Sequence, residues 1–192
     1  MSSLTSNQVL DVFRRVGALL EGHFKLSSGL HSPGYLQSAL VLQHPAEAER
    51  LGAALADLLR GLKPDVVMSP ALGGIVIGQE VARALQLRAV FAERQEKTLL
   101  LRRGFALAPG ERVVVIEDVV TTGGSTRETI DVATAAGGVV VGAGSIIDRS
   151  GGNQGLPVPY SSLAQVAFPT YQPDACPLCA AGSAAIKPGS RG

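Results

Sequence analysis

Residues 112–126 read RVVVIEDVVTTGGST, and this stretch decides the fold more than any other part of the chain. Its valines and isoleucine predict a buried strand, and Glu117 and Asp118 follow as an adjacent pair of carboxylates. A loop of small hydroxyl and glycine residues then leads into residues 127–136, which are expected to form a helix. Main-chain N–H groups at such a helix start bind phosphate, while carboxylates accept hydrogen bonds from sugar hydroxyls. The stretch therefore predicts a site for a phosphorylated sugar.

The commoner phosphate-binding motifs do not fit this stretch. A Walker loop needs a lysine, and none lies between Thr121 and Thr126. A dinucleotide fingerprint begins at Gly142 but has Ile147 where its third glycine belongs. An acidic pair after a strand is also compatible with ordinary helix capping. The glycines and hydroxyls in register favour a ligand site over that alternative.

Apolar segments of strand length alternate with helical ones along the chain. Helices are expected over residues 7–21, 45–60, 71–87 and 127–136, and strands over residues 65–68, 88–92, 112–117, 139–147 and 165–168. This alternation predicts an α/β fold whose parallel sheet is covered by helices on both faces.

The composition is that of a globular protein, with 46% hydrophobic and 17% charged residues. The net charge of +1 gives no basic field for nucleic acid or a membrane surface. No signal peptide or membrane span is recognisable, so a cytoplasmic location is expected.

Residues 112–126 resemble the diphosphoribosyl-binding motif of the type I phosphoribosyltransferases: an apolar strand, an acidic pair, two apolar residues and a Thr/Gly/Ser loop. Residues 22–37, GHFKLSSGLHSPGYLQ, resemble the N-terminal segment of orotate phosphoribosyltransferases. Ile147-Asp148-Arg149 ends the next strand, where that family has an arginine for the orotate carboxylate. The chain is therefore similar to the orotate branch.

The resemblance implies a type I phosphoribosyltransferase fold, with a central parallel sheet flanked by helices and a small N-terminal segment covering the base, the hood. It implies one domain, with an N-terminal helix and hood over about residues 1–40, a core over 45–170 and a tail over 171–192. The implied activity is a glycosyltransferase reaction of de novo pyrimidine biosynthesis, in which orotate and 5-phosphoribosyl 1-diphosphate give orotidine 5'-phosphate and diphosphate. The family is Mg²⁺-dependent and homodimeric, with a mobile catalytic loop reaching the neighbouring site, and no nucleic acid or membrane partner is implied.

The resemblance also assigns site residues. Glu117 and Asp118 are expected to orient the ribose, stabilise positive charge in the transition state and hold Mg²⁺, directly or through water. The 5'-phosphate is assigned to Thr121, Thr122, Gly123, Gly124, Ser125 and Thr126. The diphosphate is assigned to Gly73, Gly74, Arg102 and Arg103, and the catalytic loop contributes Arg94 and Lys97. Orotate is assigned to Arg149, Tyr35, Leu36, Lys25 and Thr121.

The chain departs from the family pattern at several positions. Gly73 and Gln95 stand where lysines are common, and Ser27 replaces a frequent catalytic lysine. Lys25 compensates for that loss only if its side chain points inward. Residues 93–105 resemble the mobile loop, and the alternative is a plain β-hairpin with solvated basic residues.

Cys176 and Cys179 form one C-x-x-C pair, which supplies half of a structural zinc site. The second half would come from elsewhere, for example from a symmetry-related subunit. The interpretation we prefer is two reduced cysteines in a packed tail, with His23 and His31 as partly exposed loop histidines.

Two alternative functions remain open. One is a phosphoribosyltransferase for a purine or another pyrimidine. The other is a non-catalytic regulator of the same fold that senses the sugar diphosphate, which should carry a basic face or a winged-helix segment.

Overall fold

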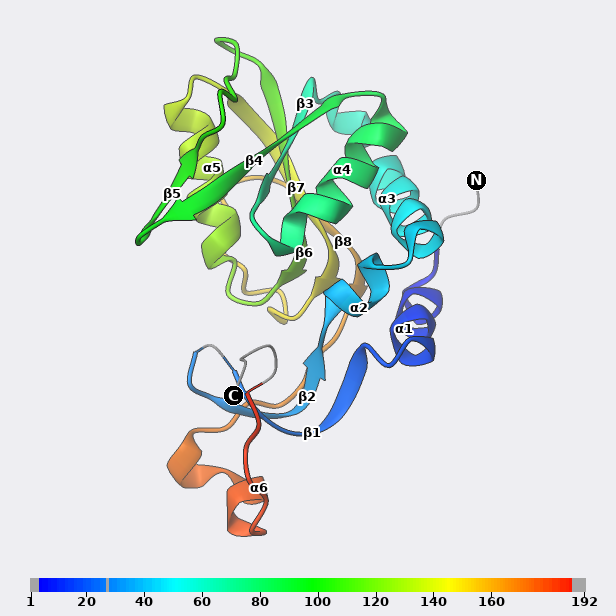
Figure 1. Cartoon of the computed structure of the whole chain (residues 1–192), viewed down its shortest axis with the longest axis vertical. Coiled ribbons are helices and arrows are strands. Elements are labelled where there is room, and N and C mark those ends of the chain that lie inside the picture. The colour runs from blue at the N-terminus through cyan, green and yellow to red at the C-terminus, as the bar shows by residue number, and fades with distance from the viewer. Residues whose placement is uncertain (1–3, 27, 188–192) are drawn as a thin grey trace.

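The computed structural model describes residues 4–26 and 28–187, which form a six-stranded sheet and a separate two-stranded hairpin (Figure 1). The strand order of the larger sheet is β5-β4-β3-β6-β7-β8, and all neighbours are parallel except β5, which is antiparallel to β4. Its strands are β3 (Val66–Pro70), β4 (Arg88–Gln95), β5 (Thr98–Leu101), β6 (Arg112–Val120), β7 (Val139–Asp148) and β8 (Tyr160–Gln165).

Helices cover both faces of this sheet, as parallel strands require. Helices α1 to α4 pack on one face and α5 packs on the other. The helices are α1 (Ser6–Arg15), α2 (Ser38–Leu42), α3 (Pro45–Leu59), α4 (Gly73–Leu85), α5 (Gly124–Ala135) and α6 (Pro177–Ala180), with 3₁₀ turns at Arg60–Leu62 and Pro173–Ala175.

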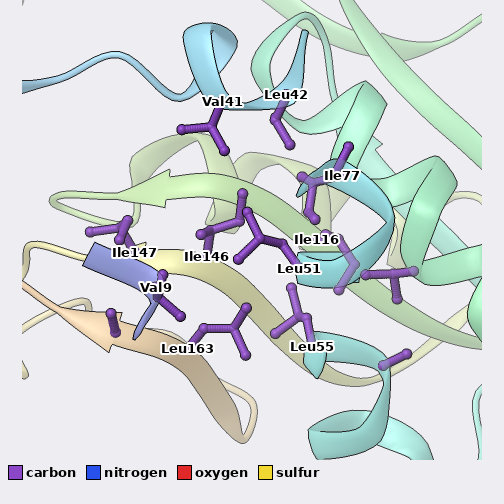
Figure 2. Packing of buried hydrophobic residues seen from close by; sticks show 14 of the residues in the cluster. Val9, Val41, Leu42, Leu51, Leu55, Ile77, Ile116, Ile146, Ile147 and Leu163 are labelled. Carbon is purple, nitrogen blue, oxygen red and sulfur yellow. The ribbon is translucent and has the colours of Figure 1, made fainter. Parts of the chain in front are cut away.

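The side chains of β6 divide between two hydrophobic clusters, because successive strand residues point to opposite faces. Val114 and Ile116 join the cluster of α1, α3 and α4, part of which is shown in Figure 2. Val113 and Val115 join the cluster that contains Ile130 of α5. All four β6 side chains are 0% exposed. Packing on both faces therefore fixes the position of the two carboxylates that follow Ile116.

The smaller sheet is the antiparallel hairpin of β1 (Leu19–Lys25) and β2 (His31–Leu36), and it corresponds to the expected hood. Figure 1 shows it outside the six-stranded sheet, joined to it through α2, with α6 on its far side. The C-terminal segment bridges to it at two points, Phe24 with Ile186 and His31 with Tyr171. Residues from both ends of the chain thus build the hood.

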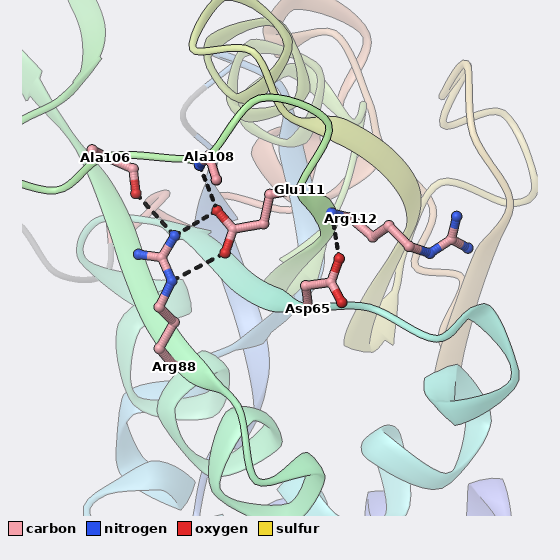
Figure 3. Close-up of polar contacts among 6 residues, drawn as sticks. All are labelled: Asp65, Arg88, Ala106, Ala108, Glu111 and Arg112. Carbon is pink, nitrogen blue, oxygen red and sulfur yellow. Dashed lines mark hydrogen bonds and ion pairs between the residues drawn. The ribbon is translucent and has the colours of Figure 1, made fainter.

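Ion pairs fix the edge of the sheet where β4 and β6 begin (Figure 3). Arg88 donates to Glu111 through Nε at 3.2 Å and Nη2 at 2.6 Å, and to the Ala106 carbonyl at 2.9 Å. Asp65 accepts from the N–H of Arg112 at 3.0 Å. This edge lies opposite the carboxyl ends of the strands, so these contacts serve stability.

The expected α/β architecture, a mostly parallel sheet between helices with a small N-terminal hairpin, is confirmed. The helix expected over residues 7–21 is wrong beyond Arg15, because residues 19–25 pair with β2 and bury Phe24. The last strand was expected over residues 165–168, but it is Tyr160–Gln165, because Tyr160–Gln165 pairs with β7. Strand β6 also runs on to Val120, because β7 offers partners as far as Asp148.

None of the helices within residues 4–26 and 28–187 has the length and apolar character needed to cross a membrane.

Candidate active site at the carboxyl ends of the central strands

Glu117 lies inside β6 and is 7% exposed. Its Oε1 accepts a hydrogen bond from the N–H of Asp118 at 3.1 Å. Burial first, and then the charge of Asp118, raises the pKa of Glu117 well above the ordinary 4.5. A buried carboxyl group with a raised pKa, next to a second carboxyl, is a candidate functional group.

Asp118 is held in place by contacts from α2 and from its own strand. Ser38 Oγ donates to Asp118 Oδ2, and the N–H of Val119 donates to Oδ1 at 2.9 Å. Ser38 is buried at the start of α2 and was missed in the sequence. Its only sequence signal, one hydroxyl residue before an apolar run, is too common to single out. The contact fixes the orientation of the Asp118 carboxylate.

The loop between β6 and α5, with the first turn of α5, lines a cavity of 240 Å³. N–H groups in the first turn of a helix lack partners within the helix, so they can donate to an anion. The cavity brings Glu117 together with all six residues expected to bind phosphate: Thr121, Thr122, Gly123, Gly124, Ser125 and Thr126. The arrangement is chemically suited to a phosphate ester beside a carboxyl group.

Gly123 is required by the geometry of this loop. It caps α5 with φ of +73°, and a Cβ at this position would lie 2.4 Å from the carbonyl oxygen of Gln154. Arg127 of α5 donates to the same carbonyl oxygen. Residues 150–155 therefore pack tightly on the phosphate loop and support it.

A second loop, after β3, lies directly against both carboxylates. A Cβ on Gly73 would lie 2.8 Å from Asp118 Oδ1, and one on Gly74 would lie 3.2 Å from Glu117 Oε1. The peptide bond between Ala71 and Leu72 in this loop is cis. The close approach gives a physical reason for glycine at position 73. It also brings the predicted diphosphate loop to the carboxylates.

Arg149 follows β7, and its N–H donates to the Val120 carbonyl at 2.7 Å, so it lies beside the end of β6. Its guanidinium carbon is 5.1 Å from the centre of the Phe168 ring. Among the described residues its buried Nε has no hydrogen-bond partner, and burial lowers the pKa of Arg149. The guanidinium stays charged at neutral pH, so this half-buried cation suits an anionic ligand.

Phe168 was missed as a site residue, because the sequence suggested only a strand there. Its ring packs against the backbone of Gly34 in β2, so it joins Arg149 to the hood. The half-buried Tyr35 follows Gly34 in β2, and the centre of the Tyr35 ring lies 5.8 Å from the centre of the Phe24 ring. Phe168 therefore positions the guanidinium beside the hood.

The other hood residues differ in their placement. Leu36 is 5% exposed and packs in the core cluster, on the opposite face of β2 from Tyr35. Lys25 is exposed, so the inward orientation on which its expected role depended is not found. Ser27 lies outside the described residues. Of these hood residues, Tyr35 is the half-buried aromatic one, on the face of β2 away from the core cluster.

Residues 93–105 contain the β4–β5 hairpin, which was the alternative to an open mobile loop. Arg94 pairs with Glu128, a residue of the phosphate cavity, at 2.5 Å. Arg102 and Arg103 pair with Glu93 at 3.7 and 2.8 Å. Lys97 is exposed in the hairpin turn, and its carbonyl accepts from Arg94. Exposed ion pairs contribute only about 0–1 kcal/mol, so an incoming polyanion can displace them.

A larger cavity of 380 Å³ lies between α1 and α3, away from these residues. Its lining contains no glycine or hydroxyl residue and consists of Leu4, Gln8, Ala46, Glu49, Arg50, Ala53, Ala54 and Asp57. The chemistry of the phosphate cavity, rather than size, identifies the candidate active site. Cys176 and Cys179 lie apart from both cavities.

Comparisons with known proteins identify the family of this chain. The family described as phosphoribosyl transferase domain matches residues 38–156. The chain is 55% identical to orotate phosphoribosyltransferase of Heliobacterium modesticaldum, covering 98% of this chain and 100% of the relative. It is 51% identical to the enzyme of that name from Thermus thermophilus, covering 91% of this chain and 96% of the relative. The crystal structure of orotate phosphoribosyltransferase from Aeropyrum pernix matches with a TM-score of 0.67 and 27% identity, over 82% of this chain and 93% of that one.

Proposed function

The chain belongs to the orotate phosphoribosyltransferases, within the phosphoribosyl transferase domain family, and from this membership we propose its reaction. It transfers the 5-phosphoribosyl group of 5-phosphoribosyl 1-diphosphate to orotate. The C1–diphosphate bond of the ribose breaks, a bond from C1 to the base nitrogen forms, and the products are diphosphate and orotidine 5'-phosphate. The reaction is a step of pyrimidine biosynthesis.

The observation that carries the choice of base is the half-buried guanidinium of Arg149, whose buried Nε has no hydrogen-bond partner among the described residues. Orotate bears a carboxylate, whereas adenine, hypoxanthine and uracil do not. A bidentate pair with that carboxylate would satisfy this cation, which lies over the Phe168 ring. Tyr35 offers an aromatic face to the same base. A site for a neutral base would leave the Nε donor without a partner.

The sugar phosphate is bound by the residues of the phosphate cavity. Main-chain N–H groups at the start of α5 hold the 5'-phosphate, and the hydroxyls of Thr121, Thr122 and Ser125 donate to it. Glu117 and Asp118 accept hydrogen bonds from the ribose hydroxyls and stabilise positive charge that develops on the ring. Their geometry is fixed before substrate binds, because Ser38 and the β6 main chain hold the Asp118 carboxylate.

Glu117 and Asp118 also fit Mg²⁺, because carboxylate oxygens are the ligands that this hard cation prefers. These two residues would hold the ion, which would supply positive charge to neutralise the departing diphosphate. The main chain at Gly73 and Gly74 lies against the same carboxylates, where the diphosphate is expected. The enzyme works in the cytoplasm as a homodimer. Four basic residues of each chain act at the neighbouring subunit's site: Arg94, Lys97, Arg102 and Arg103.

The test replaces Arg149 with glutamine and measures product formation from orotate and from neutral bases. Loss of a charged hydrogen-bonded pair of about 1.5–3 kcal/mol raises KM for orotate about 10- to 100-fold. KM for the sugar diphosphate stays unchanged. Arg149→Lys retains part of the activity, because lysine keeps the positive charge but cannot donate two parallel hydrogen bonds to a carboxylate. Arg14→Gln, an exposed arginine on α1, is the matched control.

Two results would overturn the proposal. One is nucleotide product from a purine with none from orotate. The other is tight binding of the sugar diphosphate with no product from any base, which would indicate a sensor instead of an enzyme.

A further inference from the structure

Four potential metal ligands from three separate segments meet where the hood contacts the C-terminal segment. His23 lies in β1, His31 in β2, and Cys176 and Cys179 flank and enter α6. One ligand atom from each lies within 4.8 Å of the other three. Among the described residues, this is the only such group of three or more side chains. The missing half of the C-x-x-C site is thus supplied by the same chain, not by a second subunit.

The burial of these side chains differs from the sequence expectation. His23 is 4% exposed, His31 is 7% exposed and Cys176 is 3% exposed, while Cys179 lies at the surface. The expectation of partly exposed loop histidines is therefore wrong. It failed because the C-terminal segment, more than 140 positions along the chain, covers both rings. The C-terminal segment therefore places two thiols against two buried imidazoles.

Four of the six separations between the ligand atoms match the edges of a tetrahedral metal shell, and the other two lie within 4.8 Å. Zinc–sulfur bonds of about 2.3 Å and zinc–nitrogen bonds of about 2.0–2.1 Å put nitrogen atoms about 3.3 Å apart and nitrogen about 3.6 Å from sulfur. His23 Nε2 lies 2.9 Å from His31 Nδ1 and 3.6 and 3.8 Å from the sulfurs of Cys176 and Cys179. His31 Nδ1 lies 3.3 Å from the sulfur of Cys179. These separations lie within a few tenths of an ångström of the expected edges.

A second contact orients one ligand toward the centre. His23 Nδ1 lies 2.9 Å from the carbonyl oxygen of Ser183. Because a carbonyl oxygen only accepts, Nδ1 carries the proton and Nε2 of the neutral ring keeps its lone pair. A metal-bound histidine characteristically donates its other N–H to such an outer partner. The His23 tautomer is thus set for metal binding.

We propose that His23, His31, Cys176 and Cys179 bind one Zn²⁺ ion in each chain. Two thiolates and two neutral imidazoles balance the charge of the ion, so the partly buried site is neutral once the thiol protons pass to solvent. The mixed nitrogen and sulfur set suits zinc, while Mg²⁺ and Ca²⁺ prefer oxygen. With four protein ligands no position is open for substrate, so the zinc is structural.

The zinc site clamps the C-terminal segment onto the hood. The main chain of Tyr171 exchanges two hydrogen bonds with His31, both at 2.9 Å. Ile186 donates to the His23 carbonyl at 2.8 Å and accepts from the Lys25 N–H at 2.8 Å. The two histidine ligands are therefore the residues at which the hood and the tail already meet. Zinc locks this junction and makes the hood, which carries Tyr35, a rigid cover.

Metal analysis of the full-length wild-type protein tests the proposal directly. Protein expressed in zinc-replete medium and purified under reducing conditions, without chelators, is expected to carry about one zinc per chain. After chelation, titration with Co²⁺ is expected to give the intense visible absorption of a tetrahedral site and a thiolate charge-transfer band. Zinc below about 0.1 per chain with no such cobalt spectrum would overturn the proposal, as would an equimolar content of another metal or a Cys176–Cys179 disulfide in the purified protein.

Variants locate the ion independently of catalysis. The double variant Cys176→Ser/Cys179→Ser is expected to lose over about 90% of bound zinc. The matched control is His44→Asn, which replaces the third histidine of the chain and is expected to keep full zinc content. Limited proteolysis is expected to cut the apo protein and the double variant between residues 171 and 187, but not the zinc-loaded protein. Equal protease resistance with and without zinc would refute the clamp, and full zinc content in the double variant would refute the ligand set. If the double variant does not fold, the wild-type metal content and cobalt spectrum still decide.

Discussion

Replacing Gly123 with alanine tests whether the phosphate loop depends on one left-handed residue. The φ of +73° costs an alanine about 1–2 kcal/mol relative to glycine. The new Cβ would also lie 2.4 Å from the carbonyl oxygen of Gln154, about 1 Å closer than ordinary van der Waals contact. Relief requires residues 150–155 to move, which breaks the charged hydrogen bond from Arg127, worth about 1–2 kcal/mol. The expected loss of folding free energy is about 2–4 kcal/mol.

The matched control is Gly124→Ala, one residue further on. A Cβ at Gly124 meets only Thr122 Oγ1 at 3.7 Å, and the residue is helical, so alanine is expected to be neutral or to stabilise by up to about 1 kcal/mol. Urea unfolding of both variants and the wild type measures the difference. Binding of inorganic phosphate, followed by calorimetry, is expected to weaken in Gly123→Ala.

A difference of less than about 0.5 kcal/mol between Gly123→Ala and wild type would refute this reasoning. It would mean that the loop tolerates another backbone path and that the contact with Gln154 does not shape the anion site.

Three further results are expected. Glu117→Gln is expected to raise the urea midpoint at neutral pH, because the folded state holds the pKa of Glu117 above 4.5 and stability is lost as pH rises through that raised value. An unchanged midpoint would contradict this reasoning. The same variant is expected to lower kcat at least about 100-fold. Glu111→Gln is expected to destabilise the protein by about 1 kcal/mol near pH 7. Hydrogen bonds from Arg88 hold the pKa of Glu111 below 4.5, so its stabilisation is present above pH 4.5 and disappears as pH falls through the lowered pKa. Urea titrations should therefore show a stability difference between the variant and the wild type at about pH 7 that disappears at about pH 3. Phe168→Leu raises KM for orotate about fivefold, since the ring contributes about 1 kcal/mol in placing Arg149, and an equal rise in KM for the sugar diphosphate would argue against that placement.

The sequence predicted the central strand and its loop well, because their signals are local. A β-branched run, an acidic pair and a glycine-hydroxyl loop determine β6 and the start of α5 from fewer than twenty neighbouring residues. The cavity that unites Glu117 with Thr121 to Thr126 follows directly from that order.

Other features depend on contacts between distant residues and escaped prediction. Residues 19–21 continue the helical spacing but begin β1, since pairing with β2 outweighs local preference. Ser38 reaches Asp118 from 80 positions away, and nothing near Ser38 signals that contact. The partners of Cys176 are likewise histidines brought close only by the folded hood.

The hood joins the two ends of the chain, and this has a consequence for protein synthesis. Strands β1 and β2 leave the ribosome before the large sheet, but their partners at Tyr171 and Ile186 emerge after all of its strands. A nascent chain halted before residue 171 has all the strands of the large sheet and an unfinished hood. The sheet with the phosphate cavity can therefore assemble first, whereas the hood is completed only after Ile186 has emerged. Brief protease treatment of arrested nascent chains should cut the hairpin and spare the sheet.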